Sequence, residues 1–250
     1  MKSLLHPGRT VALVFLFAIL CGTALLSLPI AHASGETGPL LTAFFTAVSA
    51  VCVTGLVVVD TGTYWSTFGQ VVIMALFQLG GFGMMTLATL LGLLVNRSFR
   101  LRAKLIAQAE SHVLGLGDIS SVAKLVLVVT LVMELAVMLL LTLRLHLSYG
   151  LGWGEAAWSG LFHSVSAFNN AGFSTYSDSL MGFVADPWIL GPVMLAIVLG
   201  GLGFPVLYEL RQRPLAWARW SIHTRITLLG TAVLIVGGTG MLAQIGRAHV

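Results

Sequence analysis

Long apolar runs alternate with short polar segments along the chain. A helix needs about 20 apolar residues to cross the hydrocarbon core of a bilayer. Runs of roughly that length predict spanning helices at 11–30, 71–95, 122–143, 188–207 and 226–242. Pro205, near the end of the fourth run, should bend or end its helix. The pattern predicts an all-α polytopic membrane protein.

Two further apolar segments, at about 40–52 and 156–168, are too short to cross. Each leads into a glycine-bearing stretch, so we expect a helix that enters the membrane and returns as non-helical backbone. Such backbone is tolerated only where it is buried in protein or lines a water-filled cavity. It can offer carbonyl oxygens to a dehydrated cation, and the partly negative C-terminal end of the preceding helix favours cations. The candidate filter carbonyls belong to Val53, Thr54, Gly55, Leu56, Asn170, Ala171, Gly172 and Phe173.

The two stretches belong to an internal repeat. Phe45, Val48, Ser49, Ala50 and Gly55 are each identical to the residue 117 positions later. The sequence LGGFG at 79–83 returns as LGGLG at 199–203, an offset of 120. Repetition of this kind indicates tandem helix–pore-loop–helix units, at 1–110 and 111–215, with the start of a third at 216–244. Close helix packing is the expected role of the motif glycines, Gly80, Gly81, Gly83, Gly200, Gly201 and Gly203.

At these residues the chain resembles a known family. Re-entrant VTGL and NNAGF segments, each followed by a helix with LGG(F/L)G, are similar to those of the Trk/Ktr/HKT superfamily of potassium transporters. The likeness is greatest to the bacterial Ktr membrane subunit and runs from about Val11 to Leu242. Family members carry four such units, whereas this chain supplies two and the opening of a third, so we expect a C-terminally truncated fragment.

The resemblance implies a potassium transporter that conducts K⁺ through the carbonyl filter. In the family, glycine at the position of Gly55 accompanies potassium selectivity and serine accompanies sodium preference. Transport is then either passive or dependent on Na⁺ as a coupling or activating ion. The complete protein would be a homodimer that binds a cytosolic nucleotide-binding ring of the RCK/KTN type. No phosphate-binding loop or dinucleotide fingerprint is present in the sequence, so we expect this chain itself to bind no cofactor.

Composition and charge fit a membrane protein. Charged residues make up 9% of the chain, against roughly 25% in soluble domains, and the mean hydropathy is +0.96. The net charge of +4 is spread over short loops, which argues against a nucleic-acid surface. Cys21 and Cys52 lie in apolar stretches and predict neither a disulfide framework nor a metal site.

The loop charges predict the topology. With a cytoplasmic N-terminus, nearly all basic residues lie inside, including the cluster Arg97–Lys104, and Arg144 lies outside. We therefore expect a multi-pass protein of the bacterial inner membrane. The residues placed outside, where acidic charge would attract cations, are Glu36, Asp60, Glu155, Asp178 and Asp186.

Two polar sites inside apolar segments need interpretation. Glu134 interrupts the third run, so it is either a pore-proximal or interhelix partner or a residue nearer the membrane interface. His163 and Ser164 lack an acidic partner, so pore-helix packing is favoured over catalysis and we expect no enzyme.

Several alternatives remain open. A secondary transporter could use broken half-helices to bind a small solute, although the repeats are parallel rather than inverted. A non-conducting membrane scaffold would not explain two matched re-entrant segments. Ala31-His32-Ala33 has the form of a signal-peptide cleavage site, but the first run is long for a signal core and we expect it to be retained. The last six residues, 245–250, match the translation of a sequencing-adapter oligonucleotide, so we expect a non-native tail.

Overall fold

The computed structural model describes residues 7–83, 118–212, 214 and 217–248. The end of the expected second span and the basic cluster Arg97–Lys104 lie outside these ranges. The described backbone is helical or irregular, with an isolated antiparallel bridge between His32 and Trp65. The all-α prediction is therefore confirmed for the described part of the chain.

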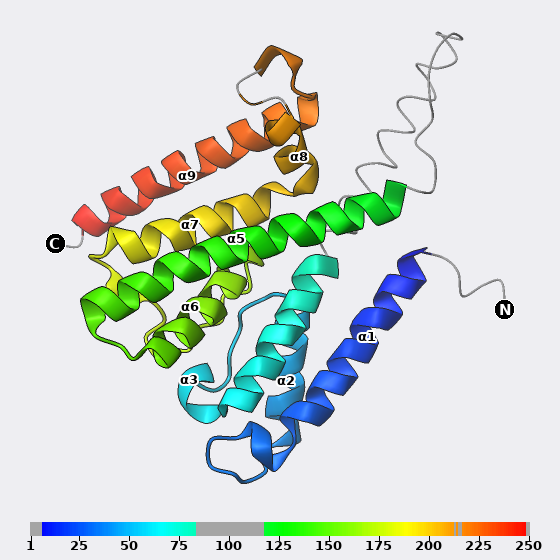
Figure 1. The fold of residues 1–250 in the computed structure, drawn as a ribbon, viewed down its shortest axis with the longest axis vertical. Helices are drawn as coiled ribbons and strands as arrows, with labels where there is room; N and C mark the ends of the chain where they lie inside the picture. The colour runs from blue at the N-terminus through cyan, green and yellow to red at the C-terminus, as the bar shows by residue number, and fades with distance from the viewer. Residues whose placement is uncertain (1–6, 84–117, 213, 215–216, 249–250) are drawn as a thin grey trace. The chain divides into compact units, whose positions relative to one another are not determined.

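The first repeat begins with α1 (Pro7–Leu26), which leads through a short 3₁₀ turn (Pro29–Ala31) to α2 (Leu40–Val51). Pro39 precedes α2 as its N-cap, where a missing N–H costs nothing. The short helix α3 (Thr61–Tyr64) follows, and then the helix Thr67–Gly83. Figure 1 shows α2 beside α1, and contacts join this pair.

The second repeat has the same order of elements. A long helix, α5 (Asp118–Tyr149), is followed by the shorter α6 (Trp153–Phe168), a 3₁₀ turn (Met181–Phe183) and α7 (Pro187–Leu202). Helix α6 packs against α5, and one hydrophobic cluster joins side chains of α5, α6 and α7. Each repeat thus places a helix of 12 or 16 residues, α2 or α6, directly after a longer one, α1 or α5 (Figure 1).

The predicted fourth span breaks earlier than its proline. Helix α7 ends at Leu202, Gly203 adopts a φ of +80°, and α8 (Phe204–Gln212) begins directly afterwards. Glycine adopts positive φ without strain, so the break falls there. Pro205 lies in the first turn of α8, a position that tolerates proline.

The chain divides into two compact units, 1–87 with 109–200 and 88–108 with 201–250. In the second unit α8 packs against α9 (Ile222–Ala248), which follows a 3₁₀ turn (Trp217–Arg219). Side chains of Ser221 and Thr224 at the start of α9 donate to Glu209 of α8 at 2.7 and 2.5 Å. These bonds fix the start of α9 within its own unit.

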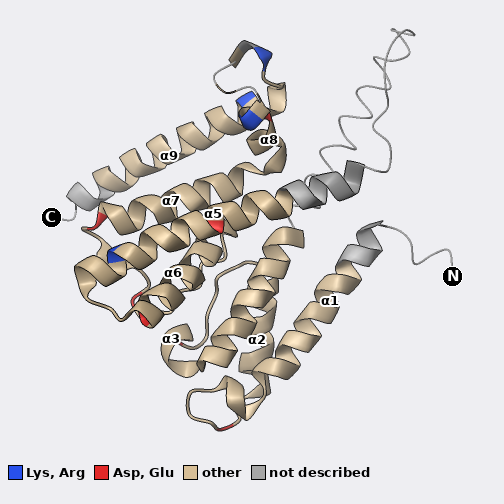
Figure 2. Cartoon of the chain, in the orientation of Figure 1, with Lys and Arg blue, Asp and Glu red and all other residues tan. Residues whose placement is uncertain are grey.

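Membrane-crossing length is reached by two described helical stretches, Val126–Tyr149 of α5 and Ile222–Gln244 of α9, and by a third if α7 and α8 form one broken span. Shorter apolar stretches are Ala12–Leu26, Leu40–Val51 and Thr67–Gly83. Figure 2 shows long stretches of helix without charged side chains. The chain is an integral membrane protein with short helices between longer ones.

Candidate functional site

The backbone after each short helix has the same unusual form. We call Val53–Leu56 and Asn170–Phe173 the candidate filter segments. Val53 and Asn170 have φ values of +56° and +57°, and the glycines two positions later, Gly55 and Gly172, have +69° and +74°. A β-branched residue such as Val53 rarely adopts positive φ, so its surroundings must hold it there. Strain of this kind gathers at functional sites.

Matched hydrogen bonds hold both candidate filter segments against their short helices. The hydroxyl of Ser49 donates to the carbonyl of Leu56, and that of Ser166 donates to the carbonyl of Phe173, each at 2.7 Å. Backbone bonds close the same turn in both, from Thr54 N to Ser49 O at 2.9 Å and from Ala171 N to Ser166 O at 2.8 Å. The sequence analysis noted that these serines repeat but assigned them no role. Their repetition at the offset of 117 was the available signal.

The two segments meet backbone to backbone at their glycines. A Cβ added at Gly55 would lie 2.7 Å from the carbonyl oxygen of Ala171 and 3.0 Å from the Cα of Gly172. A Cβ added at Gly172 would lie 3.3 Å from the Cα of Gly55. Residues 117 positions apart in sequence therefore sit side by side, and neither position has room for a side chain.

The glycine motifs bring a long helix onto the end of each short one. A Cβ on Gly80 would collide with the carbonyl oxygen of Val51, and a Cβ on Gly200 with that of Phe168. These carbonyls belong to the last residues of α2 and α6. Both repeats thus support the start of the candidate filter segment in the same way.

The other motif glycines have separate surroundings. A Cβ on Gly81 would collide with the side-chain oxygen of Asn169, and one on Gly83 would lie 2.9 Å from the ring of Phe15. Gly201 and Gly203 lie where α7 gives way to α8, and Gly203 supplies the positive φ of that break. Helix packing explains Gly80, Gly81, Gly83 and Gly200, whereas Gly203 has a backbone role.

Glu134 is an interhelix hydrogen-bond partner. Its side chain is 4% exposed. Gln78 Nε2 donates to one carboxylate oxygen at 3.2 Å, and Asn169 Nδ2 donates to the other at 3.1 Å. Asn169 Nδ2 also lies 2.6 Å from Gln78 Oε1 and 2.9 Å from the carbonyl oxygen of Val165, so its two N–H groups are shared among three acceptors. The sequence analysis singled out Glu134 but neither amide partner.

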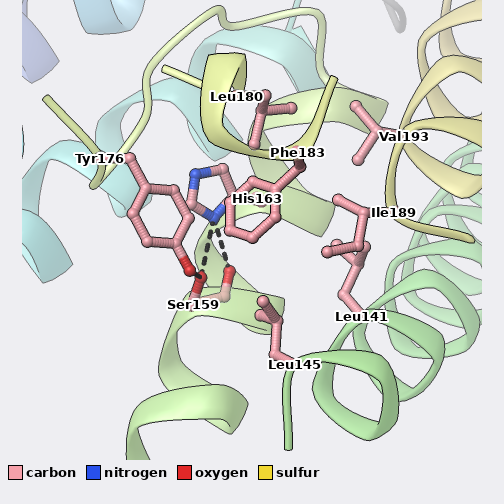
Figure 3. Close-up of a pocket in the computed structure, with 9 residues that line it drawn as sticks. All are labelled: Leu141, Leu145, Ser159, His163, Tyr176, Leu180, Phe183, Ile189 and Val193. Atoms are coloured by element: carbon pink, nitrogen blue, oxygen red, sulfur yellow. Dashed lines mark hydrogen bonds between the residues drawn. The ribbon is translucent and has the colours of Figure 1, made fainter. Parts of the chain in front are cut away.

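His163 links α6 to the loop after the second candidate filter segment. Its Nδ1 lies 2.8 Å from the carbonyl of Ser159, and its Nε2 lies 3.0 Å from the hydroxyl of Ser174, the residue after Phe173. One neutral tautomer satisfies both contacts, with Nδ1–H donating and Nε2 accepting. Figure 3 shows the rings of His163 and Tyr176 face to face, with centroids 5.0 Å apart. These contacts give His163 a structural role.

The cavity beside His163 is small. Its volume is about 10 Å³, room for at most one water molecule. The lining is mostly apolar, with Leu141, Leu145 and Val193 among its residues (Figure 3). It does not offer space for an organic substrate. Among the described residues no group of three or more His, Cys, Asp or Glu could hold a metal ion.

Hydrogen bonds join the loops that follow the two candidate filter segments. Ser177 donates to the carboxylate of Asp60, which also accepts from Gly62 N at 2.9 Å. These bonds, first of all that from Ser177, hold the pKa of Asp60 below its usual range. Asp60 and Ser177 are themselves 117 positions apart. The acidic residue expected at the pore mouth therefore also ties the two repeats together.

A second acidic residue of the predicted outer side is paired. Asp186 accepts from Arg144 Nε at 2.8 Å and from the Tyr149 hydroxyl at 3.0 Å. The hydrogen bond from Arg144 holds the pKa of Asp186 below its usual range. This carboxylate fixes the end of α5 against the start of α7, because it also accepts from Trp188 N at 2.9 Å.

The family described as cation transport protein (TrkH) matches residues 12–221. The chain is 38% identical over 230 residues to the Ktr system potassium uptake protein B of Bacillus subtilis, covering 91% of this chain and 50% of that protein. It is 36% identical over 238 residues to the protein of the same name from Vibrio alginolyticus, covering 92% and 50%. It is 32% identical over 241 residues to the potassium/sodium uptake protein NtpJ of Enterococcus hirae, covering 95% and 52%. The chain thus spans about half the length of the curated relatives it matches.

Proposed function

The chain belongs to the TrkH family of cation transport proteins, and from this premise we propose that it forms part of the pore of a potassium uptake transporter. The observation that carries the proposal is the contact between Gly55 and Gly172, where two segments of matched backbone conformation meet without intervening side chains. Four such units surround the ion path in the complete protein. This chain provides the first two.

The proposed ion site is made of backbone carbonyls. K⁺ that leaves water needs oxygens at matched distances, and uncharged carbonyls supply them without trapping the ion. The serine bonds to the Leu56 and Phe173 carbonyls anchor the far end of each segment to its short helix, so the backbone between is held in place before an ion arrives. The C-terminal ends of α2 and α6 lie directly before the candidate filter segments, which adds favourable potential for a cation.

The surroundings of the pore follow from the same proposal. The N-terminus is cytoplasmic, the protein lies in the bacterial inner membrane, and the loops containing Asp60 and Asp186 face outward. Asp60 then lies after the first candidate filter segment on the outer side, where its negative charge attracts cations.

Partners and coupling ions remain part of the proposal. Two relatives are named as components of a Ktr system, which supports a complex with further proteins. We infer a homodimer of complete pores that docks on a cytosolic nucleotide-binding ring. The potassium/sodium name of the Enterococcus hirae relative supports Na⁺ as a second ion.

Growth of an uptake-deficient bacterium on limiting potassium tests the proposal. The strain carries the uninterrupted gene that contains this sequence, unchanged or with Gly55→Asp or Gly172→Asp. Each aspartate would intrude where a Cβ already meets the other segment and would add a trapping charge. We expect growth with the parent and loss of growth with both variants at equal membrane abundance.

Gly154→Asp is the matched control. Gly154 lies in the first turn of α6, and a Cβ there has no described atom within 4 Å. An acidic residue near a helix N-terminus is favourable, so this variant should grow like the parent. Growth of the Gly55→Asp and Gly172→Asp strains at the parental rate would show that the segments are not a filter. Failure of the parent would point to another substrate, including a small solute.

A further inference from the structure

The buried contacts of Glu134 connect three parts of the molecule. Glu134 lies on α5 of the second repeat, Gln78 on the helix Thr67–Gly83 of the first repeat, and Asn169 at the end of α6. A carboxylate in apolar surroundings is costly unless it is hydrogen-bonded, and here both of its oxygens accept bonds. This cost indicates that the Glu134 carboxylate has a functional role beyond helix packing.

Asn169 connects the Glu134 carboxylate to the second candidate filter segment. It caps α6 and is followed immediately by Asn170, whose φ of +57° begins the second candidate filter segment. The two N–H groups of Asn169 Nδ2 are shared among oxygens of Glu134, Gln78 and Val165, and Gly81 packs against its side-chain oxygen. The orientation of the residue before the segment is therefore set by its side chain as well as by the helix.

We propose that Glu134 is a positioning residue for ion selectivity: through Asn169 it fixes the second candidate filter segment at its junction with α6 and couples that segment to the first repeat. The inference rests on the proposed function, since selectivity presupposes that the segment contacts the ion. Glu134 does not itself touch the ion. It acts through Asn169 and the backbone that follows.

The two repeats differ at this point. At the offset of 117, Asn169 corresponds to Cys52, whose side chain has no amide to donate. The first candidate filter segment is therefore held by Ser49 and Gly80 without such a network. The second segment has the matched serine and glycine and the carboxylate network in addition.

Hydrogen-bond directions make the network testable. Both oxygens of Glu134 accept, so Glu134→Gln replaces one acceptor by an amide donor that faces the donor of Gln78. Rotating the Gln78 amide moves the conflict onto Asn169, which is already committed as a donor to the Val165 carbonyl. One donor–donor contact remains in every arrangement.

Exchanging the two residues removes the conflict. In the double variant Gln78→Glu with Glu134→Gln, the carboxylate at position 78 accepts from Asn169 and from the new amide at position 134. The amide oxygen at position 134 still accepts from Asn169. Charge and atom content are unchanged, and every donor again has an acceptor.

The experiment measures uptake kinetics of K⁺ and Na⁺ in the full-length transporter at equal membrane abundance. For Glu134→Gln we expect the preference for K⁺ over Na⁺ to fall roughly fivefold to tenfold, the factor of about one lost hydrogen bond, with a higher KM for K⁺. The exchange variant should recover most of that preference. A merely structural role would lower the amount of transporter without changing the ratio.

Two further variants keep the proposal open to refutation. Thr142→Val removes another buried hydroxyl of α5, whose bond goes to the first turn of α6 at Ala156, and should leave selectivity unchanged. Asn169→Cys introduces the residue of the first repeat and should lower selectivity as Glu134→Gln does. It decides the question if Glu134→Gln does not accumulate.

The outcomes separate this inference from the proposed function. Parental selectivity in Glu134→Gln or in Asn169→Cys would overturn the positioning role while leaving the potassium pore intact. An exchange variant that accumulates but stays as unselective as Glu134→Gln would also overturn it. A parent that transports no K⁺ removes both proposals.

Discussion

Gly200→Ala should destabilise the transporter because the added methyl group has no free space. Gly200 lies in α7, and its Cβ would collide with the carbonyl oxygen of Phe168 and lie 3.1 Å from Nδ2 of Asn170. The obstructing oxygen belongs to the backbone of α6, so it cannot move as a flexible side chain would. Either α7 moves away or the end of α6 shifts.

Gly230→Ala provides the control, since Gly230 lies inside α9, is not followed by proline, and a Cβ there has no described atom within 4 Å. Both alanines gain about 1 kcal/mol of helix propensity over glycine. The difference between the variants is therefore the overpacking cost, about 1–3 kcal/mol. A cost of about 2 kcal/mol corresponds to a difference in melting temperature of roughly 2–4 °C in a full transporter of about twice this length.

The assay heats the purified transporter in detergent to a series of temperatures. Size-exclusion chromatography then measures the fraction of protein that stays monodisperse at each temperature, which gives the melting temperature. We expect Gly230→Ala to melt at or above the parental temperature and Gly200→Ala a few degrees below it. Gly200→Ala should also impair K⁺ uptake, because the displaced carbonyl precedes the second candidate filter segment. Melting of Gly200→Ala within about 1 °C of Gly230→Ala, below the shift expected for overpacking, would refute the close approach of α7 to α6.

Three further predictions concern the site and its supports. Ser166→Ala removes the donor to the Phe173 carbonyl at a cost of about 1 kcal/mol. The preference for K⁺ over Na⁺ in uptake should fall by a larger factor than the membrane abundance does. Equal losses would contradict a role of Ser166 in holding the candidate filter segment. Gly55→Ser should admit more Na⁺, measured as a permeability ratio, and an unchanged ratio would count against the filter assignment. The hydrogen bond from Arg144 lowers the pKa of Asp186 in the folded protein, so the ionised carboxylate stabilises the fold fully above the unfolded pKa of about 4. This stabilisation is lost as the pH falls from the unfolded pKa through the lower folded pKa. The parental melting temperature should therefore drop more steeply below pH 4 than that of Asp186→Asn, and parallel curves would exclude the pair as the cause.

Element types could be predicted from the sequence because they depend on local pattern. The re-entrant helices follow from length alone, and α2 (Leu40–Val51) and α6 (Trp153–Phe168) end within a residue of the predicted positions. The third run extends further than its apolar stretch, since α5 continues to Tyr149 past Arg144. Helical hydrogen bonding can continue through a charged residue at the membrane edge, so hydropathy marks the buried part of a helix rather than its end.

The supports of the candidate site could be predicted only in part. Identity at the offset of 117 marks Ser49 and Ser166, but their carbonyl partners follow only from the turn that the backbone makes after each short helix. Gln78 and Asn169 are 91 residues apart, and no local pattern connects them. Their contact depends on how the first repeat packs on the second.

The carbonyl ion site that we propose explains which interactions recur between the repeats and which do not. An ion bound by backbone oxygens responds to backbone geometry, so the interactions that recur are those that act on the backbone: the serine bonds, the glycine contacts and the positive φ angles. Side chains that act from behind the segment are free to differ, as Asn169 and Cys52 do. A pore built this way can keep one coordination geometry while each unit is tuned separately, so variants of Asn169 should change selectivity more than variants of Cys52.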